Sequence, residues 1–437
     1  MNREMKNSNI PWIGYIPASW TTCHIKQIMR NKSIKGYPNE TVLSLYREYG
    51  VVPKDSRTDN HNITSEDTSN YKFVEIGDFV INKMKAWQGS MAVSDYQGII
   101  SPAYYICRFV SNDVCKRYIH YLLRNETYKT EYMRLSSGLR VGQWDLNIED
   151  FLRIQMVLPL YAEQKAIADF LDKKCEEIDE LVALQEKIIE ELKAYKQSVI
   201  TETVCKGLNP NAPMKDSGVE WIGEIPEHWS LCKLKNYLSQ TPNNLRVGPF
   251  GTALSGNDIK ESGKYWIYNQ RTVLDENFTT CNSFVDEEKY LELESFKIYP
   301  NDILITTRGS IGKITIVPNN APVGILHPCI IRFVIDENRF NTSLLKHIFN
   351  GSDFVLRQMK YQSNSTTIDV LYSYALKNIV LPNIPIYEQQ EIADYLDKKC
   401  AEIDQLITIK QQKIVELKEY KKSLIYEYTT GKKRVEA

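Results

Sequence analysis

Long apolar runs are absent from this 437-residue sequence, and its first ten residues are mostly polar. A membrane-spanning helix needs about 18 consecutive apolar residues, and a secretory signal needs an apolar core, so neither segment is expected. We therefore expect a cytoplasmic protein without membrane contact. The nine cysteines are an odd number and include no CxxC pair, which favours reduced, buried thiols over a disulfide framework or a zinc site.

Catalytic motifs are missing as well. The sequence has no Walker loop, no HExxH, no GxSxG, and no NPPY motif with a glycine-rich loop for S-adenosylmethionine. Its six histidines lack the spacing of metal ligands. We predict that the chain is not an enzyme and has no catalytic or metal-binding residues. The net charge of −1 neither requires nor excludes nucleic acid, because an average can hide a local basic face.

Two segments of the sequence are repeated, with different offsets. Trp12–Trp20, which reads WIGxIPxxW, returns 209 positions later at Trp221–Trp229, and Glu163–Cys175 returns 225 positions later at Glu388–Cys400. The offsets differ by 16, so the second half has about that many extra residues between its repeats. If the sequence had diverged uniformly after a duplication, the segments at both ends of each half would not have stayed similar. Matching ends around different bodies therefore predict a constant scaffold that presents two variable modules.

These repeats predict an α+β fold, with two similar mixed α/β modules separated by two long helices that form an antiparallel coiled coil. The first helical segment contains no proline or glycine, and Gly207 follows it, as expected beyond a helix C-terminus. The expected parts are a first module at 1–160, a central helix at 161–207, a second module at 208–385, a C-terminal helix at 386–430 and a tail at 431–437.

Both helical segments have an apolar heptad seam with mostly charged flanks, which predicts a coiled coil. Gln185 and Lys410 are the middle a positions of the two segments, so they would fall near one layer if the helices pair antiparallel within the chain. The alternative is a seam that docks on its own module. The expected interface residues are Leu171, Ile178, Leu181, Gln185, Ile188, Leu192 and Val199 in the first helix, and Leu396, Ile403, Leu406, Lys410, Leu417 and Leu424 in the second.

The two bodies share strand-like runs, such as 78–81 and 302–305, but differ in their other residues. Each of these runs leads into a loop, 82–90 or 306–313, that combines glycine with cations, hydroxyls or amides, the groups that contact phosphates and base edges. A turn with solvated charges fits these loops equally well. The candidate DNA-contacting residues are Lys83, Lys85, Gln88, Arg140, Gln143, Asn269, Gln270, Arg271, Thr307, Arg308, Ser310 and Lys313.

The two WIGxIPxxW segments, IADFLDKKCEEID at 167–179, KMKAWQG at 83–89 and GPFG at 248–251 together resemble the specificity subunits of Type I restriction–modification systems. The resemblance covers nearly the whole chain. It implies two target-recognition domains, each of which reads one half of a bipartite, asymmetric site in double-stranded DNA. It also implies that the helices set the spacer length and dock methylation subunits, with two expected, and that restriction subunits join them. S-adenosylmethionine, ATP and Mg²⁺ are expected in those partners and not in this chain.

Two other classes of function remain open on the sequence alone. The chain is compatible with an assembly adaptor that tethers proteins through its coiled coil without reading DNA. It is also compatible with a nuclease whose active site has no recognised motif. DNA binding with and without methylation subunits distinguishes the first alternative, and metal-dependent cleavage by the isolated chain would indicate the second.

Overall fold

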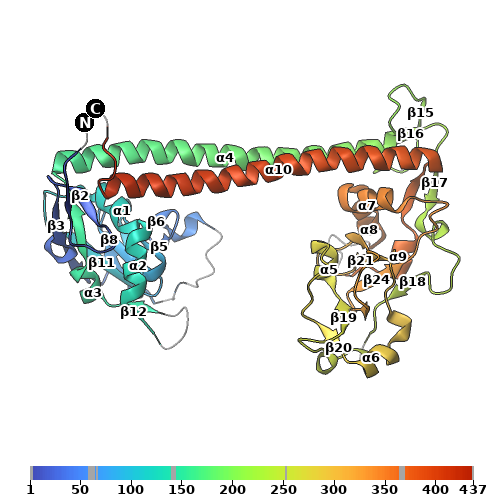
Figure 1. The fold of residues 1–437 in the computed structure, drawn as a ribbon, viewed down its shortest axis with the longest axis horizontal. Coiled ribbons are helices and arrows are strands. Elements are labelled where there is room, and N and C mark those ends of the chain that lie inside the picture. Colours follow the sequence, from blue (N-terminus) through green and yellow to red (C-terminus); the bar gives the residue numbers. More distant parts are fainter. Residues whose placement is uncertain are drawn as a thin grey trace. The chain divides into compact units, whose positions relative to one another are not determined.

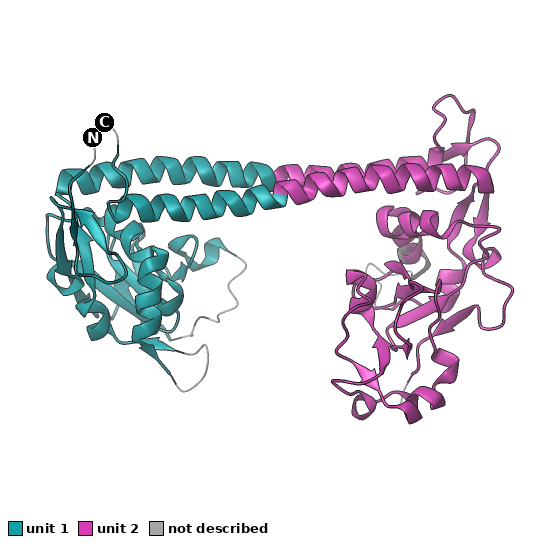
Figure 2. Ribbon diagram, viewed as in Figure 1, with its two compact units in different colours: residues 1–186, 411–437 teal, residues 187–410 magenta. Residues whose placement is uncertain are grey.

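The computed structural model describes residues 3–57, 64, 67–138, 144–250, 253–363 and 370–435 (Figure 1). Contacts divide the chain into two compact units, which Figure 2 colours separately. Unit 1 contains residues 1–186 and 411–437, and unit 2 contains residues 187–410. Each unit has a mixed α/β body and a portion of both long helices, so the units cut across the predicted helix boundaries.

The body of unit 1 is built on a four-stranded antiparallel sheet in the order β4-β11-β8-β9. Two consecutive helices, α1 and α2, contribute buried apolar residues to the same core as this sheet. The elements are β4 (Met29–Lys32), β8 (Phe79–Asn82), β9 (Met91–Val93), β11 (Tyr104–Phe109), α1 (Lys116–Arg124) and α2 (Glu126–Leu135).

Smaller strand pairs and one short helix complete unit 1. β14 pairs with β3, β10 with β7, β6 with β5, β2 with β1 and β13 with β12. Their bounds are β1 (Met5–Asn7), β2 (Tyr15–Pro17), β3 (Thr21–His24), β5 (Leu43–Tyr46), β6 (Gly50–Pro53), β7 (Lys72–Val74), β10 (Gly98–Ile100), β12 (Ser136–Ser137), β13 (Asp145–Leu146), β14 (Gln155–Leu158) and α3 (Ile148–Arg153).

The body of unit 2 repeats the central sheet in the order β18-β24-β21-β22. A second sheet, β20-β19-β23, includes the parallel pair β19 and β23. The bounds are β15 (Met214–Asp216), β16 (Glu224–Pro226), β17 (Ser230–Lys233), β18 (Leu245–Val247), β19 (Tyr265–Tyr268), β20 (Phe284–Val285), β21 (Ile303–Thr306), β22 (Ile314–Ile316), β23 (Gly324–Leu326), β24 (Ile330–Phe333), β25 (Val380–Asn383), α5 (Gln270–Asp275), α6 (Glu287–Glu292), α7 (Thr342–Gly351), α8 (Phe354–Ser363) and α9 (Ser373–Lys377).

A buried ion pair recurs in the central sheet of each unit. Lys32 lies 2.6 Å from Asp78 in unit 1, and Arg332 lies 3.4 Å from Asp302 in unit 2. Each aspartate also accepts a backbone N–H from the residue three positions earlier, as an Asp capping a tight turn does. Because these carboxylates are buried and paired, they hold the start of β8 and β21 in place and belong to the scaffold.

Two long helices, α4 (Tyr161–Lys206) and α10 (Ile386–Thr429), each contribute to both units. In unit 1 the rings of Phe170 and Tyr428 lie 4.4 Å apart, and Lys421 binds Asp179. Residue numbers rise along one helix while they fall along the other, so the two segments pack antiparallel. In unit 2 the α4 and α10 segments are joined by an ion pair between Lys196 and Asp404.

The buried stripe of the helices differs from the predicted seam. Along α4 the buried residues are Leu171, Cys175, Ile178 and Val182, which are separated by steps of four, three and four positions. Cys175 and Val182 therefore take the second seam position, which the prediction had placed three residues after each a residue. Leu181 and Leu406 were predicted at the interface, but they are 46% and 47% exposed and lie outside the stripe. The a residues were identified, but the second seam position comes four residues after each a residue, and not three.

The other predicted seam residues lie on the packed side to different degrees. Gln185 belongs to unit 1 and Lys410 to unit 2, so their common layer stays a prediction. The buried residues are Leu171, Ile178, Leu396, Ile403 and Leu424, and the half-buried ones are Gln185, Ile188, Leu192, Val199, Lys410 and Leu417.

The repeated Glu-Gln pair at the start of each helix holds the helix against its own body. Trp20 is fully buried and its indole N–H donates to Glu163 at 3.1 Å, and Trp229 donates to Glu388 at 3.0 Å in the same way. The adjacent glutamine is also buried, and Gln164 accepts the backbone N–H of Cys115 at 2.8 Å. This network links the two repeated motifs in each half and explains why they repeat together.

Candidate nucleic-acid interface

The loop that follows β8 in unit 1 carries three of the candidate residues. Lys85 is exposed, while Lys83 and Gln88 are half-buried. A short turn of 3-10 helix, Ala86–Gln88, ends at Gly89, whose φ of +79° favours glycine. The Gln88 side-chain carbonyl accepts a hydrogen bond from the guanidinium of Arg47, which lies in the turn between β5 and β6.

Positive charge gathers beside this loop. The pKa of Lys72 is lowered, first by burial and then by the nearby charges of Lys83 and Lys35. Like charges near an ammonium disfavour its charged form and create a positive potential that an anion relieves. The Lys72 ammonium donates to the Tyr104 carbonyl at 2.6 Å, which fixes it under the loop. A DNA phosphate is the anion that such a cluster suits.

Two adjoining hollows of about 570 and 390 Å³ lie between this loop and the β5–β6 hairpin. Both are lined by Ser44, Asn82, Lys85 and Tyr104, which are a hydroxyl, an amide, a cation and an aromatic ring. Arg47 lines the smaller hollow. These groups match those that contact phosphates and base edges, so the hairpin and the loop form one candidate surface.

In unit 2 the loop after β21 occupies the equivalent place. The backbone N–H of Lys83 donates to the Ala103 carbonyl at 3.4 Å, and that of Thr307 donates to the Cys329 carbonyl at 3.0 Å. Both loops are therefore held against the strand turn that follows the repeated Ser-Pro or His-Pro sequence. The same backbone position carries different side chains in the two units.

The structure brings two of the unit 2 candidates together. Gly309 of the loop lies against the Gln270 side-chain amide, since an added Cβ there would stand 3.1 Å from Nε2. Arg308 is exposed beside them. The pKa of His327 is lowered, first by the burial of His327 and then by the charge of Arg308. Gln270, Arg308 and the exposed Ser310 thus form the candidate reading surface of unit 2.

Other predicted residues have structural roles. Thr307 is only 3% exposed, so its side chain is not available to DNA, and this prediction was wrong. The Lys313 ammonium donates to the Asn350 carbonyl at 2.7 Å near the end of α7, so it satisfies a helix terminus instead. The Asn269 side chain caps α5. Arg271 pairs with Asp275 at 3.1 Å on the same helix, but its side chain is 84% exposed, so its contact with DNA stays a prediction.

Arg140 and Gln143 lie outside the described residues, so their placement stays a prediction. Arg47, Ser44 and Tyr104 were missed by sequence reasoning. Arg47 stands in a short turn, Tyr46 to Gly50, between two strand-like runs, and that hairpin pattern is the signal that could have identified it.

Each of the two repeated modules presents cations from an equivalent loop, an arrangement that suits contact with nucleic acid. A family model for the Type I restriction modification DNA specificity domain matches the chain twice, over residues 17–194 and 247–419. The chain therefore belongs to this family and carries two copies of the domain. It is a DNA sequence-specificity subunit of the Type I restriction–modification class.

Known proteins resemble the chain along most of its length. The MjaVIII specificity subunit of a Type I restriction enzyme from Methanocaldococcus jannaschii is 25% identical, over 83% of each chain. The EcoBI specificity subunit from Escherichia coli is 28% identical over 57% of this chain and 52% of its own. A solved structure from work on assembly and conformational transition of a Type I system has a TM-score of 0.69 at 13% identity, covering 95% of this chain and 98% of its own, which supports the fold alone.

The cysteines and the other possible metal ligands of the described residues form no further site. All nine cysteines are free thiols, and burial raises the pKa of Cys175 and Cys400. Within the described ranges, no three His, Cys, Asp or Glu side chains are grouped so as to hold a metal ion. No helix in the described part of the chain has both the length and the apolar character to cross a membrane.

Proposed function

We propose that each unit reads one half of a bipartite, asymmetric site in double-stranded DNA. The observation that carries the proposal is the pair of equivalent loops, each anchored by the same backbone hydrogen bond. In unit 1 the anchored loop presents Lys83, Lys85 and Gln88, and in unit 2 it presents Arg308 and Ser310. One scaffold with two sets of side chains suits two different half-sites.

In this proposal the helices α4 and α10 dock methylation subunits. Leu181 and Leu184 are 46% and 50% exposed, and the residues 225 positions later, Leu406 and Ile409, are 47% and 54% exposed. Large apolar side chains that stay exposed at equivalent helix positions favour a protein partner. Because the pair occurs once in each unit, two methylation subunits fit better than one.

The chemistry belongs to the partners in this proposal. Methylation subunits bind S-adenosylmethionine and methylate adenine, while restriction subunits use ATP and Mg²⁺ for translocation and cleavage. The present chain contributes binding and spacing without catalysis. Two linked modules gain affinity for a site whose halves match their separation, because the second module binds at a high effective concentration.

Methylome sequencing of cells with and without this gene tests the proposal. We expect one bipartite methylated motif that disappears with the gene. Exchange of residues 21–160 for the body of another specificity subunit should replace one half of the motif and leave the other half unchanged. An unchanged motif would contradict the proposal, and so would the absence of any gene-dependent motif in a host with active methylation subunits.

A further inference from the structure

The two WIGxIPxxW segments, each with the strand before it, have equivalent backbone hydrogen bonds. The N–H of Ala18 donates to the Glu4 carbonyl at 2.9 Å, and the N–H of Glu227 donates to the Pro213 carbonyl at 2.8 Å. β1 pairs with β2 in the same register as β15 with β16. With this offset of 209, the position of Arg3 in unit 1 is occupied by Ala212 in unit 2.

In unit 1 this position supplies an arginine to the helix start. The Arg3 guanidinium donates to both carboxylate oxygens of Glu163, at 2.7 and 2.9 Å, and lies 5.5 Å from the centroid of the Trp20 ring. The Arg3 and Glu163 side chains are each 26% exposed. A single nitrogen, Nη2, makes both contacts, so this is a charge-assisted hydrogen bond and not the pair of two parallel N–H groups that a guanidinium can form.

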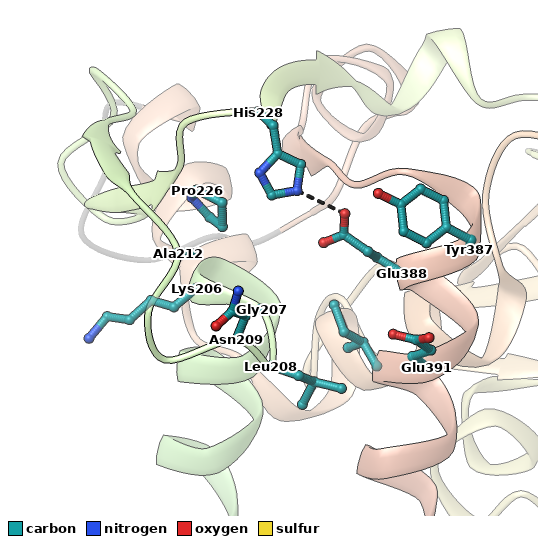
Figure 3. A pocket seen from close by; sticks show the side chains of 11 residues that line it. Lys206, Gly207, Leu208, Asn209, Ala212, Pro226, His228, Tyr387, Glu388 and Glu391 are labelled. Atoms are coloured by element: carbon teal, nitrogen blue, oxygen red, sulfur yellow. Dashed lines mark hydrogen bonds and ion pairs between the residues drawn. The ribbon is translucent and has the colours of Figure 1, made fainter.

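In unit 2 the carboxylate remains but the arginine is missing. Glu388 accepts the Trp229 indole N–H at 3.0 Å, as Glu163 does from Trp20, and its other oxygen lies 2.8 Å from His228. Ala212 leaves an open pocket of about 430 Å³ beside this glutamate (Figure 3). The rest of its lining includes Lys206, Asn209, Tyr387 and Glu391.

The pocket is more acidic than its counterpart. Glu391 stands where unit 1 has Ala166, and Arg3 has no counterpart in unit 2. Lys206 supplies a cation to the lining, and it pairs with Glu202 one turn earlier in α4 at 3.4 Å. Burial raises the pKa of Glu388, but hydrogen bonds from His228, Trp229 and Tyr387 outweigh that effect and leave the pKa lowered. Glu388 is therefore an anion near neutral pH. Among the described residues, Glu391 has no cation within ion-pair distance.

We infer that this pocket binds the guanidinium of an arginine side chain that another polypeptide presents. Unit 1 shows the same carboxylate and tryptophan with an arginine in place. In unit 2 His228 contacts the equivalent carboxylate oxygen, and the pocket lies beside that contact. Arginine suits the site better than lysine because its planar fork can contact Glu388 and Glu391 together, and because Tyr387 adds an aromatic wall. This inference goes beyond DNA reading and does not depend on it.

The test uses the full-length chain and N-acetyl-arginine amide, a blocked arginine, followed by NMR or calorimetry. We expect one site with a dissociation constant of roughly 1 mM, since a part-exposed ion pair is weak. The blocked lysine analogue should bind about fivefold more weakly. Free arginine should also bind more weakly, because its own carboxylate meets two acidic side chains. Tighter binding of free arginine would point to a small-molecule guanidine and overturn the polypeptide assignment.

Three variants complete the test. Ala212→Arg should fill the pocket from within and abolish binding of the blocked arginine. Glu391→Gln should weaken binding by about fivefold, because one charge partner is lost. Arg3→Ala should open the equivalent place in unit 1 and add a second, weaker site. Absence of binding to the unaltered chain would show that His228 already satisfies Glu388, and binding unchanged by Ala212→Arg would place the bound arginine outside this pocket. Either result would overturn the inference.

Discussion

Lys421 of α10 donates to both carboxylate oxygens of Asp179 of α4, at 2.7 and 2.6 Å. The offset of 225 relates this pair to Lys196 and Asp404, which have the same two distances with the roles of the helices exchanged. Each unit thus has the same antiparallel register between its two helix segments. The aspartates are 64% and 57% exposed, so these pairs define register but add little stability, roughly 0.2–1 kcal/mol each.

The register predicts which residues stabilise unit 1. Ile178→Ala should lower the free energy of unfolding by about 2–4 kcal/mol, because a buried side chain is lost from the core. Leu181→Ala, three residues further along the same helix, should change it by less than about 0.5 kcal/mol, because that side chain is largely exposed. Urea unfolding followed by circular dichroism measures both. If both variants lost the same free energy of unfolding, the heptad assignment that places Leu181 in the seam would be correct after all.

The repeats made the duplicated architecture and the two long helices predictable, because matched segments and a proline-free heptad pattern are long-range signals. Shorter breaks give no such signal. Residues 114–135 contain no proline or glycine, yet Asn125 ends α1 and caps α2, since its side chain accepts the Thr127 N–H. An asparagine in an amphipathic run gives no warning that it will cap a new helix, because the same residue is tolerated inside one.

The candidate DNA surface was less predictable than the fold. Lys313 and Arg308 are both cations of one loop, but only the structure shows that Lys313 serves a helix end while Arg308 is exposed. Arg47 joins the unit 1 loop from a hairpin about forty positions earlier. Which cation faces solvent depends on tertiary packing, and a single sequence carries no local sign of that.

The exposed apolar pairs of the helices predict the number of docked methylation subunits. Replacement of Leu181 and Leu184 by lysine should remove one of two subunits, and replacement of Leu406 and Ile409 should remove the other. All four changes together should leave the chain without methylation subunits. Size-exclusion chromatography with light scattering measures the stoichiometry. The unfolding midpoint serves as control, since exposed positions tolerate charge; retention of both subunits by the fourfold variant would refute this docking surface.

The two candidate surfaces predict different defects in DNA binding. Lys85→Ala should weaken binding to all sequences and lower the salt dependence by about one counterion, as expected for a phosphate contact. Arg308→Ala should cost about 1–3 kcal/mol on the preferred site and relax one half of the motif. Fluorescence anisotropy with the methylation subunits present measures both. Lys313→Ala is the control, and it should leave the preferred bases unchanged.

A half-buried histidine predicts acid sensitivity of unit 1. Burial, reinforced by the charge of Arg124, lowers the pKa of His120 from 6.5 to about 3, and its Nε2 lies 2.6 Å from the Arg124 guanidinium. Below pH 6.5 His120 binds a proton in the unfolded chain but stays neutral in the folded chain. Stability is therefore lost as the pH falls from 6.5 towards 3, by up to roughly 1.4 kcal/mol per pH unit.

Replacement of His120 by asparagine should flatten the pH dependence of unfolding in that window, even though the variant is less stable at pH 7. His24→Asn, which changes a histidine that binds the Arg153 carbonyl near the surface, serves as the matched comparison. Urea denaturation at a series of pH values provides the slopes. The same slope in the His120 variant and the unaltered chain would show that other groups cause the acid loss.

The proposed role of the helices as a ruler predicts the effect of shortening both. Removal of residues 186–192 from α4 and 408–414 from α10 deletes one heptad from each helix and retains the Asp179–Lys421 and Lys196–Asp404 pairs. At 1.5 Å per residue the helices lose about 10 Å, which corresponds to about three base pairs. Methylome sequencing should reveal a shorter spacer between unchanged half-sites, or loss of methylation if the rotated half-site cannot be reached. Deletion from α4 alone, the control, should disturb the helix register and abolish binding. An unchanged spacer after the paired deletion would mean that the helices do not measure the distance.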